Sequence, residues 1–356
     1  MLRLEGKRKL NLGRYPYTYV RTSVMKSLLF KKEDYQKMMK MGFSEIAKYM
    51  QDSNYKKEIN ELATSHSGSD LLELALNRNL ANSYKKLLRI SPNTLGMLVK
   101  AYVKRKDVED IKTIIRGKLT NASQAEILNS ITEAGLLDHA FLMSLLKKDS
   151  IEEVLKANRM IELSAFKDGL KELKEKNSIV AIENAMDKYY YSSLAEFSKT
   201  IPKQGNLFRN FIQKEIDAMN MLTLFRLKKA KFNKERIKTF MVSPSGKIKM
   251  SKLADLANVE DFGELAKAFS KTEYGNVVSE GIEEYKKTGS LIKLETGLYK
   301  HVLRQSMLML HQHPLSVDVI LGYMFAKEIE IRNLKIIIKG KQLGLKEDFI
   351  ENQLVF

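Results

Sequence analysis

The chain has 356 residues, of which 44% are hydrophobic and 29% are charged, and this composition excludes the disordered and collagen-like classes. Because a single core ordinarily stops growing near about 250 to 300 residues, we expect two or three units. The 61 Lys and Arg residues against 43 Asp and Glu residues give a formal net charge of +18, which favours an anionic partner such as a phosphate backbone, a membrane surface or an acidic protein face. The absence of cysteine excludes disulfides, thiolate metal sites and cysteine nucleophiles.

The N-terminal residues are basic and lack the hydrophobic stretch of a signal peptide. Met1 to Lys9 leads into Leu-Asn-Leu-Gly rather than into an apolar run. The longest segment without a charged residue, Gln305 to Val317, is shorter than the ~18 to 20 residues that a membrane-spanning helix needs. We therefore expect an intracellular protein whose association with a membrane, if any, is peripheral.

Helical periodicity runs through almost the whole chain, which contains only five prolines and 18 glycines. A representative segment has acids from Asp107, an apolar face from Ile111 to Ile115, and then Arg116 and Gly117. Acids near the start of a helix, a cation near its end and a glycine C-cap are the usual boundary signals. We predict an all-α fold in which Gly117 ends this helix.

Two further signals concern element boundaries. Ser91 followed by Pro92 predicts an N-cap with proline at the first helical position. The next ~25 residues fit either one long helix or two helices joined near Asp107. The only candidate strand is the segment from Lys247 to Met250, after a Ser-Pro-Ser-Gly turn.

An internal repeat is the most informative feature of the sequence. Three prolines precede a basic position at almost the same spacing, and the pairs are Pro92 with Arg116, Pro202 with Arg226, and Pro314 with Lys339. Nine positions before each basic residue lies an acid, namely Asp107, Asp217 and Glu330. Successive copies are offset by about 110 residues, close to a third of the chain, and a repeat of this length indicates small domains rather than short solenoid units.

An upstream pattern gives the same period. It begins at Phe43, Ile151 and Phe262, and these positions are separated by almost the same interval as the basic positions. We therefore predict three similar helical units, with boundaries at residues 1–122, 123–233 and 234–356. Three similar units in one chain favour an approximate threefold arrangement around a central hollow.

Sequence motifs for catalysis are missing. None of the Gly-Lys pairs is followed by the Ser or Thr of a phosphate-binding loop, and neither the dinucleotide glycine fingerprint nor a nucleophile elbow occurs. For the pair His311 and His313, a structural role at a helix junction is favoured over metal binding, because no carboxylate spacing completes a site. We predict no catalytic, cofactor-binding or metal-binding residues.

Aromatic and methionine clusters have two interpretations. The tyrosines at 15, 17 and 19 and those from Tyr189 to Tyr191 could stack on bases, but helix packing is favoured because neither cluster lies in a nucleic-acid module. Met38, Met39 and Met41 are interpreted as core residues that fill gaps between helices.

The basic ends of the three repeats are the candidate partner-binding residues. Equivalent positions around an axis would form a basic rim, whereas the alternative is that these cations only complement helix dipoles. The candidate residues are Arg116, Lys118, Arg226, Lys228, Lys339 and Lys341.

Four segments together resemble a known family. They are Tyr15–Leu29, Asn184–Tyr190, Asp217–Lys228 and His313–Lys341. The chain resembles the C subunit of the archaeal-type (A-type) ATP synthase, in the family that also contains the d subunit of the vacuolar ATPase. The sequence departs from the family by a basic extension over residues 1–11 and by Leu227, where the other repeats have glycine. The latter predicts a different C-cap in the middle repeat.

This resemblance implies a helical funnel of three domains with a central hollow. It further implies a non-catalytic rotor subunit without cofactors, present in one copy per complex on the cytoplasmic side of the membrane. Its partners would be the proteolipid ring, the D and F subunits of the central stalk and the membrane surface, with no nucleic acid and no small-molecule substrate. We expect some of the six cations to contact acidic faces of these partners. The alternative is a basic helical scaffold that binds nucleic acid.

Overall fold

The computed structural model describes residues 15–158, 160–201, 206–243, 246–312 and 317–355. Within these ranges every regular element is a helix and no strand occurs, which confirms the predicted all-α fold. The candidate strand after the turn at Gly246 is therefore wrong. No helix in the described ranges is both long and apolar enough to cross a bilayer.

The chain divides into two compact units. Unit 1 comprises Met1–Leu29 and Lys40–Leu194, and unit 2 comprises Phe30–Met39 and Ala195–Phe356. The helices of unit 1 are α1 (Pro16–Ser27), α3 (Phe43–Gln51), α4 (Lys56–Leu62), α5 (Gly68–Ile90), α6 (Asn93–Leu119), α7 (Gln124–Ser130), α8 (His139–Leu146), α9 (Ile151–Ala157), the 3₁₀ turn η1 (Leu163–Phe166), α10 (Lys167–Lys176) and most of α11 (Val180–Lys199). Those of unit 2 are α2 (Lys32–Lys40), α12 (Asn206–Lys229), α13 (Lys234–Phe240), α14 (Met250–Leu256), α15 (Phe262–Phe269), α16 (Gly275–Thr288), α17 (Ile292–Gln312), α18 (Val317–Gln342) and α19 (Glu347–Gln353). The three predicted domain boundaries stay predictions.

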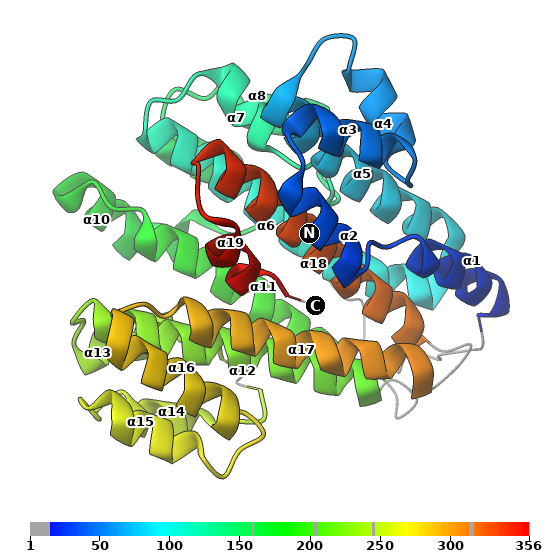
Figure 1. Cartoon of the computed structure of the whole chain (residues 1–356). Helices are drawn as coiled ribbons and strands as arrows, with labels where there is room; N and C mark the ends of the chain where they lie inside the picture. Colours follow the sequence, from blue (N-terminus) through cyan, green and yellow to red (C-terminus); the bar gives the residue numbers. More distant parts are fainter. Residues whose placement is uncertain (1–14, 159, 202–205, 244–245, 313–316, 356) are drawn as a thin grey trace. The chain divides into compact units, whose positions relative to one another are not determined.

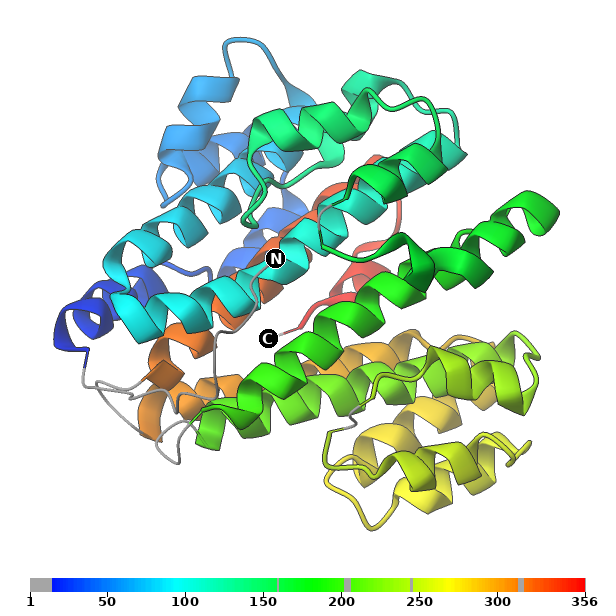
Figure 2. The same cartoon turned by 180° about the vertical axis from the view of Figure 1, so that it is seen from behind.

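In unit 1, α5 and α6 form a long antiparallel hairpin, and α7, α8 and α9 pack against α6 (Figures 1 and 2). The segment after Pro92 is one continuous helix that passes through Asp107, so the two-helix alternative is wrong. Pro92 is the N-cap and α6 begins at Asn93, one position later than predicted. Pro202 and Pro314, the equivalent prolines of the other repeats, lie outside the described residues.

In unit 2, α12, α16 and α17 lie side by side, with α15 against α16 (Figures 1 and 2). Their facing sides form one apolar core that includes Phe225, Leu265, Phe269 and Leu298, each fully buried. The rings of Phe225 and Phe269 lie 6.1 Å apart, a spacing at which aromatic pairs attract. The amphipathic pattern of these helices is therefore explained by burial of one face of each.

A repeated polar contact, which we call the first anchor, joins each long helix to the backbone of a segment outside regular helices. Asp107 accepts hydrogen bonds from the backbone N–H groups of Leu136 and Leu137, at 2.7 and 2.8 Å. Asp217, the equivalent acid of the second repeat, accepts them from Lys247 and Ile248, at 2.9 and 3.1 Å. The segment at residues 247–248 forms a bend and is thus held by a carboxylate rather than by a neighbouring strand.

The first anchor of the third repeat takes its donor from the other end of the sequence. Glu330 accepts the N–H of Phe30 at 2.6 Å, a contact across 300 residues, and also pairs with the buried Lys327. In the first two repeats a glycine, Gly135 or Gly246, precedes the donors, and a Cβ there would collide with the carboxylate of the anchor. The third repeat has a leucine before Phe30 and uses the longer Glu side chain.

One turn after each first anchor lies a second anchor, formed by Asp110, Asn220 and Asn333. Each binds the backbone 22 residues downstream. Asn220 accepts the N–H of Val242 at 2.7 Å and donates to its carbonyl at 3.1 Å. Asn333 makes the same pair of bonds with Val355, at 2.9 and 2.6 Å. Asp110 accepts from Thr132 and from the next residue, so the contact recurs three times with the predicted period.

The C-terminal caps of α6, α12 and α18 are alike, contrary to expectation. In each, a residue with positive φ follows the helix, namely Asn121, Lys231 and Gly344. The next N–H bonds back to the carbonyls of Gly117, Leu227 and Gly340 in a Schellman pattern. The prediction that Gly117 ends α6 is therefore wrong, because the helix continues as far as Leu119.

The glycines have a packing role instead. A Cβ at Gly117 would collide with the side chain of Ile127, just after the start of α7, and one at Gly340 would lie 2.6 Å from Ile350 on α19. Glycine at these two positions lets the following short helix pack closely against the long one. In the middle repeat Leu227 is accommodated as a partly buried residue packed against the unit 2 core.

We expect Asn220→Ala to lower the free energy of unfolding by about 2 to 4 kcal/mol, because it leaves both backbone groups of Val242 buried without their partner. Urea unfolding followed by circular dichroism measures this change. The matched control is Asn276→Ala at an exposed position of α16, which should change stability by less than about 0.5 kcal/mol. Equal losses in the two variants would contradict a stabilising role for the second anchor.

Candidate interaction surface

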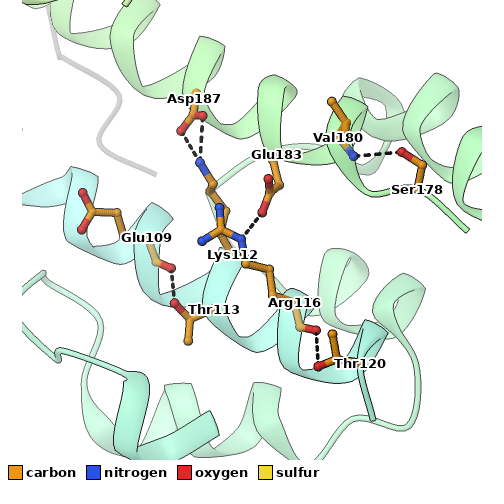
Figure 3. Close-up of polar contacts among 9 residues, drawn as sticks. All are labelled: Glu109, Lys112, Thr113, Arg116, Thr120, Ser178, Val180, Glu183 and Asp187. Carbon is orange, nitrogen blue, oxygen red and sulfur yellow. Dashed lines mark hydrogen bonds and ion pairs between the residues drawn. The ribbon is translucent and has the colours of Figure 1, made fainter. Parts of the chain in front are cut away.

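The candidate cations of the first two repeats make equivalent ion pairs. Arg116 on α6 pairs with Glu183 on α11 at 2.5 Å, beside a second pair between Lys112 and Asp187 at 2.8 Å (Figure 3). In unit 2, Arg226 on α12 pairs with Glu295 on α17. Both arginine side chains stay more than half exposed, at 56% and 54%. Each arginine therefore joins two long helices while its side chain stays partly open to solvent.

Glu295 connects a third helix to this arrangement. Its other carboxylate oxygen lies 3.6 Å from Arg332 on α18, whose guanidinium also covers the ring of Tyr299 at 4.2 Å. A planar guanidinium can pair with a carboxylate and stack on an aromatic ring at once. The result is a polar seam along α12, α17 and α18 within unit 2.

Two of the candidate lysines bind the ends of short helices. Lys118 donates to the carbonyls of Leu146, at 3.0 Å, and of Lys148, at the C-terminus of α8. Lys341, the equivalent residue of the third repeat, donates to the carbonyl of Met39 at 2.5 Å, at the C-terminus of α2. A cation at this place satisfies unpaired carbonyls and complements the helix dipole. These two lysines thus complement helix dipoles, but the dipoles are those of α8 and α2 and not those of the helices that carry the lysines.

The two remaining candidates have weaker partners. Partial burial lowers the pKa of Lys228, and the nearby charge of Glu260 acts in the opposite direction. Lys339 donates to Gln342 one turn further along α18, at 3.2 Å. The structure therefore places the six cations at equivalent helix ends, repeat by repeat, and their contact with a partner stays a prediction.

The tyrosine clusters have different outcomes. Tyr190 is 3% exposed and donates to the carbonyl of Tyr102 at 3.1 Å, which confirms helix packing for this residue. Tyr189 accepts a hydrogen bond from Lys104 at 3.2 Å. Tyr17 on α1 is 64% exposed, so packing is the wrong prediction there. Met38 is fully buried, as a core role requires.

A cluster of charged groups surrounds Glu273 in unit 2. The carboxylate lies 2.5 Å from Lys214, 3.2 Å from His301 and 3.6 Å from Lys247. Burial acts to raise the pKa of Glu273, but Lys214, Lys247 and a hydrogen bond from His301 hold that pKa below its usual value. Burial lowers the pKa of His301 despite the adjacent carboxylate. The cluster binds α12, α17 and the segment before α16 to one another.

No candidate metal centre is found in the part of the chain that the structure describes, where no three His, Asp or Glu side chains gather closely enough to hold an ion. The histidine pair before Pro314 lies outside what the structure describes, since neither the His311 side chain nor His313 is placed.

The anchors are unusual because they bury acids. Burial raises the pKa of Asp107, Asp110 and Asp217 to about 6 from an ordinary 3.8, while the backbone N–H donors act to lower it. Asp217 also accepts a hydrogen bond from the hydroxyl of Tyr274 at 3.3 Å. The desolvation cost of each carboxylate is thus only partly offset by its donors.

These observations define a class: an all-helical repeat protein in which polar anchors and interhelical ion pairs fix long hairpins. Residues 18–353 match the family described as ATP synthase (C/AC39) subunit. The chain is 39% identical to the A-type ATP synthase C subunit of Methanosarcina acetivorans over 99% of this chain and 96% of that protein. It is 38% identical to the C subunit from Methanosarcina barkeri over 99% of this chain and 96% of that protein. It is 32% identical to the C subunit from Haloferax volcanii over 95% of this chain and 97% of that protein.

The chain therefore belongs to the ATP synthase C/AC39 subunit family and is a subunit of a rotary ATP synthase. The resemblance seen in the sequence is confirmed over nearly the whole chain. Other subunits of that complex are its partners. The ion pairs to Glu183 and Glu295 were missed from sequence, although the interval between these two acids nearly equals the period of the repeat.

The buried acid Asp217 predicts a distinct pH dependence. Its pKa in the folded state, about 6, lies above the unfolded value near 3.8, so the folded protein binds the proton more tightly. Its contribution to the free energy of unfolding is therefore greatest near pH 4 and below, and falls by about 2 to 3 kcal/mol as pH rises to 6 and beyond. Urea unfolding of the natural protein and of Asp217→Asn across this range isolates the effect as a difference. If the natural protein gains stability relative to Asp217→Asn as pH rises, the predicted loss of the Asp217 contribution is contradicted.

Proposed function

We propose that this chain is a non-catalytic subunit of the central rotor, which links the D and F subunits of the central stalk to the proteolipid ring. In this role it transmits torque during ATP synthesis coupled to proton or sodium transport, while the catalytic sites lie on other chains. It is present in one copy, held peripherally at the cytoplasmic side of the membrane. The observation that carries the proposal is the family match, which spans residues 18–353 and so includes all three repeats.

The contacts of the described residues suit a part under torque. A subunit that transmits torque must resist bending, and close-packed helices with fixed hydrogen bonds have low compressibility. The first and second anchors occur in all three repeats and hold each long helix to backbone groups of distant segments. Ion pairs such as Arg116 with Glu183 add a link between neighbouring long helices. These features support a mechanical role.

We further propose that the half-exposed arginines at the basic ends contact acidic faces of partner subunits. A guanidinium that already pairs with one carboxylate has further N–H donors for a second. The other four candidate cations would contribute to the field that steers the partner, since long-range attraction needs no direct contact. The nucleic-acid alternative keeps only the net charge in its favour.

The test is native mass spectrometry of the purified full-length chain with the detergent-solubilised proteolipid ring and, separately, with the D and F pair. We expect one copy of the chain to bind each partner. If the chain binds neither partner although circular dichroism shows its helical content intact, the rotor proposal is contradicted. Binding to one partner alone would contradict its role as a link.

Paired variants test the arginines within the same assay. Arg116→Gln with Arg226→Gln removes the cations. Glu183→Gln with Glu295→Gln breaks the same ion pairs, together with the pair between Glu295 and Arg332, but leaves the cations in place. We expect the arginine variant to bind about fivefold more weakly at low salt, and the glutamate variant to bind as well as the natural chain or better. Equal weakening by both variants would mean that the ion pairs matter only for the fold.

A further inference from the structure

Helix α1 exposes its apolar side chains and buries polar ones. Tyr17, Val20, Val24 and Leu28 follow one another at helical spacing and are 64%, 56%, 56% and 51% exposed. The opposite face of the helix is buried through two threonines, at positions 18 and 22, and a methionine. A water-exposed helix ordinarily has the reverse arrangement. The exposed apolar stripe therefore needs an explanation beyond the folding of unit 1.

The stripe lies beside the turn at Pro92, which joins α5 to α6. The hydroxyl of Thr18 donates to the carbonyl of Ile90, the last residue of α5, at 2.6 Å. The first turns of α6 begin directly after this proline, and there Met97 is also exposed, at 40%. The stripe and the turn thus form one end of the α5–α6 hairpin, which we call the proline end.

The proline end combines two stretches of sequence that contain no acid. Residues 15–29 and 74–106, both in unit 1, lack Asp and Glu, and the second stretch carries eight Lys and Arg, of which Lys106 is buried. The nearest acids along α5 and α6 are Glu73 and Asp107, each about 20 Å or more from Pro92 along the helix axis. Arg21 lies on α1 within the exposed stripe, between Val20 and Val24. Arg21, Arg89 and Lys100, which are all exposed, thus lie on α1, α5 and α6.

We propose that the proline end of unit 1 binds the surface of a bilayer that contains anionic lipids. The stripe on α1 enters the boundary between headgroups and acyl chains, and Arg21 with the neighbouring cations of α5 and α6 meets the lipid phosphates. An amphipathic helix with a cationic flank lies in the plane of such an interface. Each Lys or Arg near an anionic surface adds to the attraction, whereas a neutral bilayer offers only the apolar term. The proposal rests on the proposed function only for the presence of the chain at a membrane.

The probe is a flotation assay of the full-length chain with vesicles of phosphatidylcholine, alone or with about 30 mol % phosphatidylglycerol. We expect binding to the anionic vesicles, weakening at about 0.5 M salt, and little binding to the neutral ones. Val20→Ser with Val24→Ser should weaken binding about tenfold. Arg21→Gln should weaken it about fivefold.

Matched controls separate this face from the charge of the whole chain. Val180→Ser with Ile292→Ser removes two exposed apolar side chains elsewhere, and Lys171→Gln removes an exposed cation on α10. Both controls should bind the anionic vesicles as the natural chain does. Equal losses in test and control variants, or no loss in any, would overturn the proposal because binding would then follow net charge alone.

The remaining outcomes are also decisive. One such outcome is that the chain does not bind vesicles but binds the lipid-free proteolipid ring, and that Val20→Ser with Val24→Ser abolishes binding to the ring. The stripe would then recognise protein, and the lipid proposal would be wrong. If the chain binds anionic vesicles through the proline end but neither the ring nor the D and F pair, the proposed function fails while this inference stands. Circular dichroism of each variant confirms that α1 substitutions leave the fold intact.

Discussion

The structure depends on polar side chains of the long helices that accept the backbone N–H groups of returning loops. Asp107 and Asp217 do this at the first anchor, whereas Glu330 accepts the N–H of Phe30 near the N-terminus. The residue one turn later forms the second anchor in each repeat. A loop without such a partner would bury unpaired N–H groups, which is costly. The carboxylates bear a desolvation cost in turn, visible in the pKa of about 6 for Asp217. The hydrogen bonds that fix the loop thus come with the desolvation cost of a buried carboxylate.

The third repeat shows how this constraint organises the chain. Its donor is Phe30, so a segment near the N-terminus completes the contact that later loops complete in the first two repeats. Lys341 repeats the arrangement, since it binds the carbonyl of Met39 where Lys118 binds that of Leu146. The contacts therefore group residues 30–39 with the C-terminal unit. Such long-range closure resists unravelling from either end.

Sequence predicted the helical class and the period, because both leave a strong periodic signal. The acids at Asp107, Asp217 and Glu330 were found as repeated positions, but their role was not, since each donor is a distant backbone group without a sequence signature. Gly117 carried the signal of a C-cap and proved to be a packing position, because both uses select a residue without a Cβ. The exposure of Tyr17 also escaped prediction, since periodicity shows a face but not what covers it.

Native-state hydrogen exchange of the full-length chain tests the central claim most directly, because it reads the anchored N–H groups themselves. We expect the amides of Leu136, Lys247 and Phe30, which lie outside regular helices, to be protected as strongly as buried amides of α6, α12 and α18. Replacing the matching anchor, as in Asp107→Ala for Leu136, should remove the protection at that loop and leave the other two loops unchanged. Exchange of these three amides at the rate of exposed loops in the natural protein would contradict the role of the anchors in holding the fold.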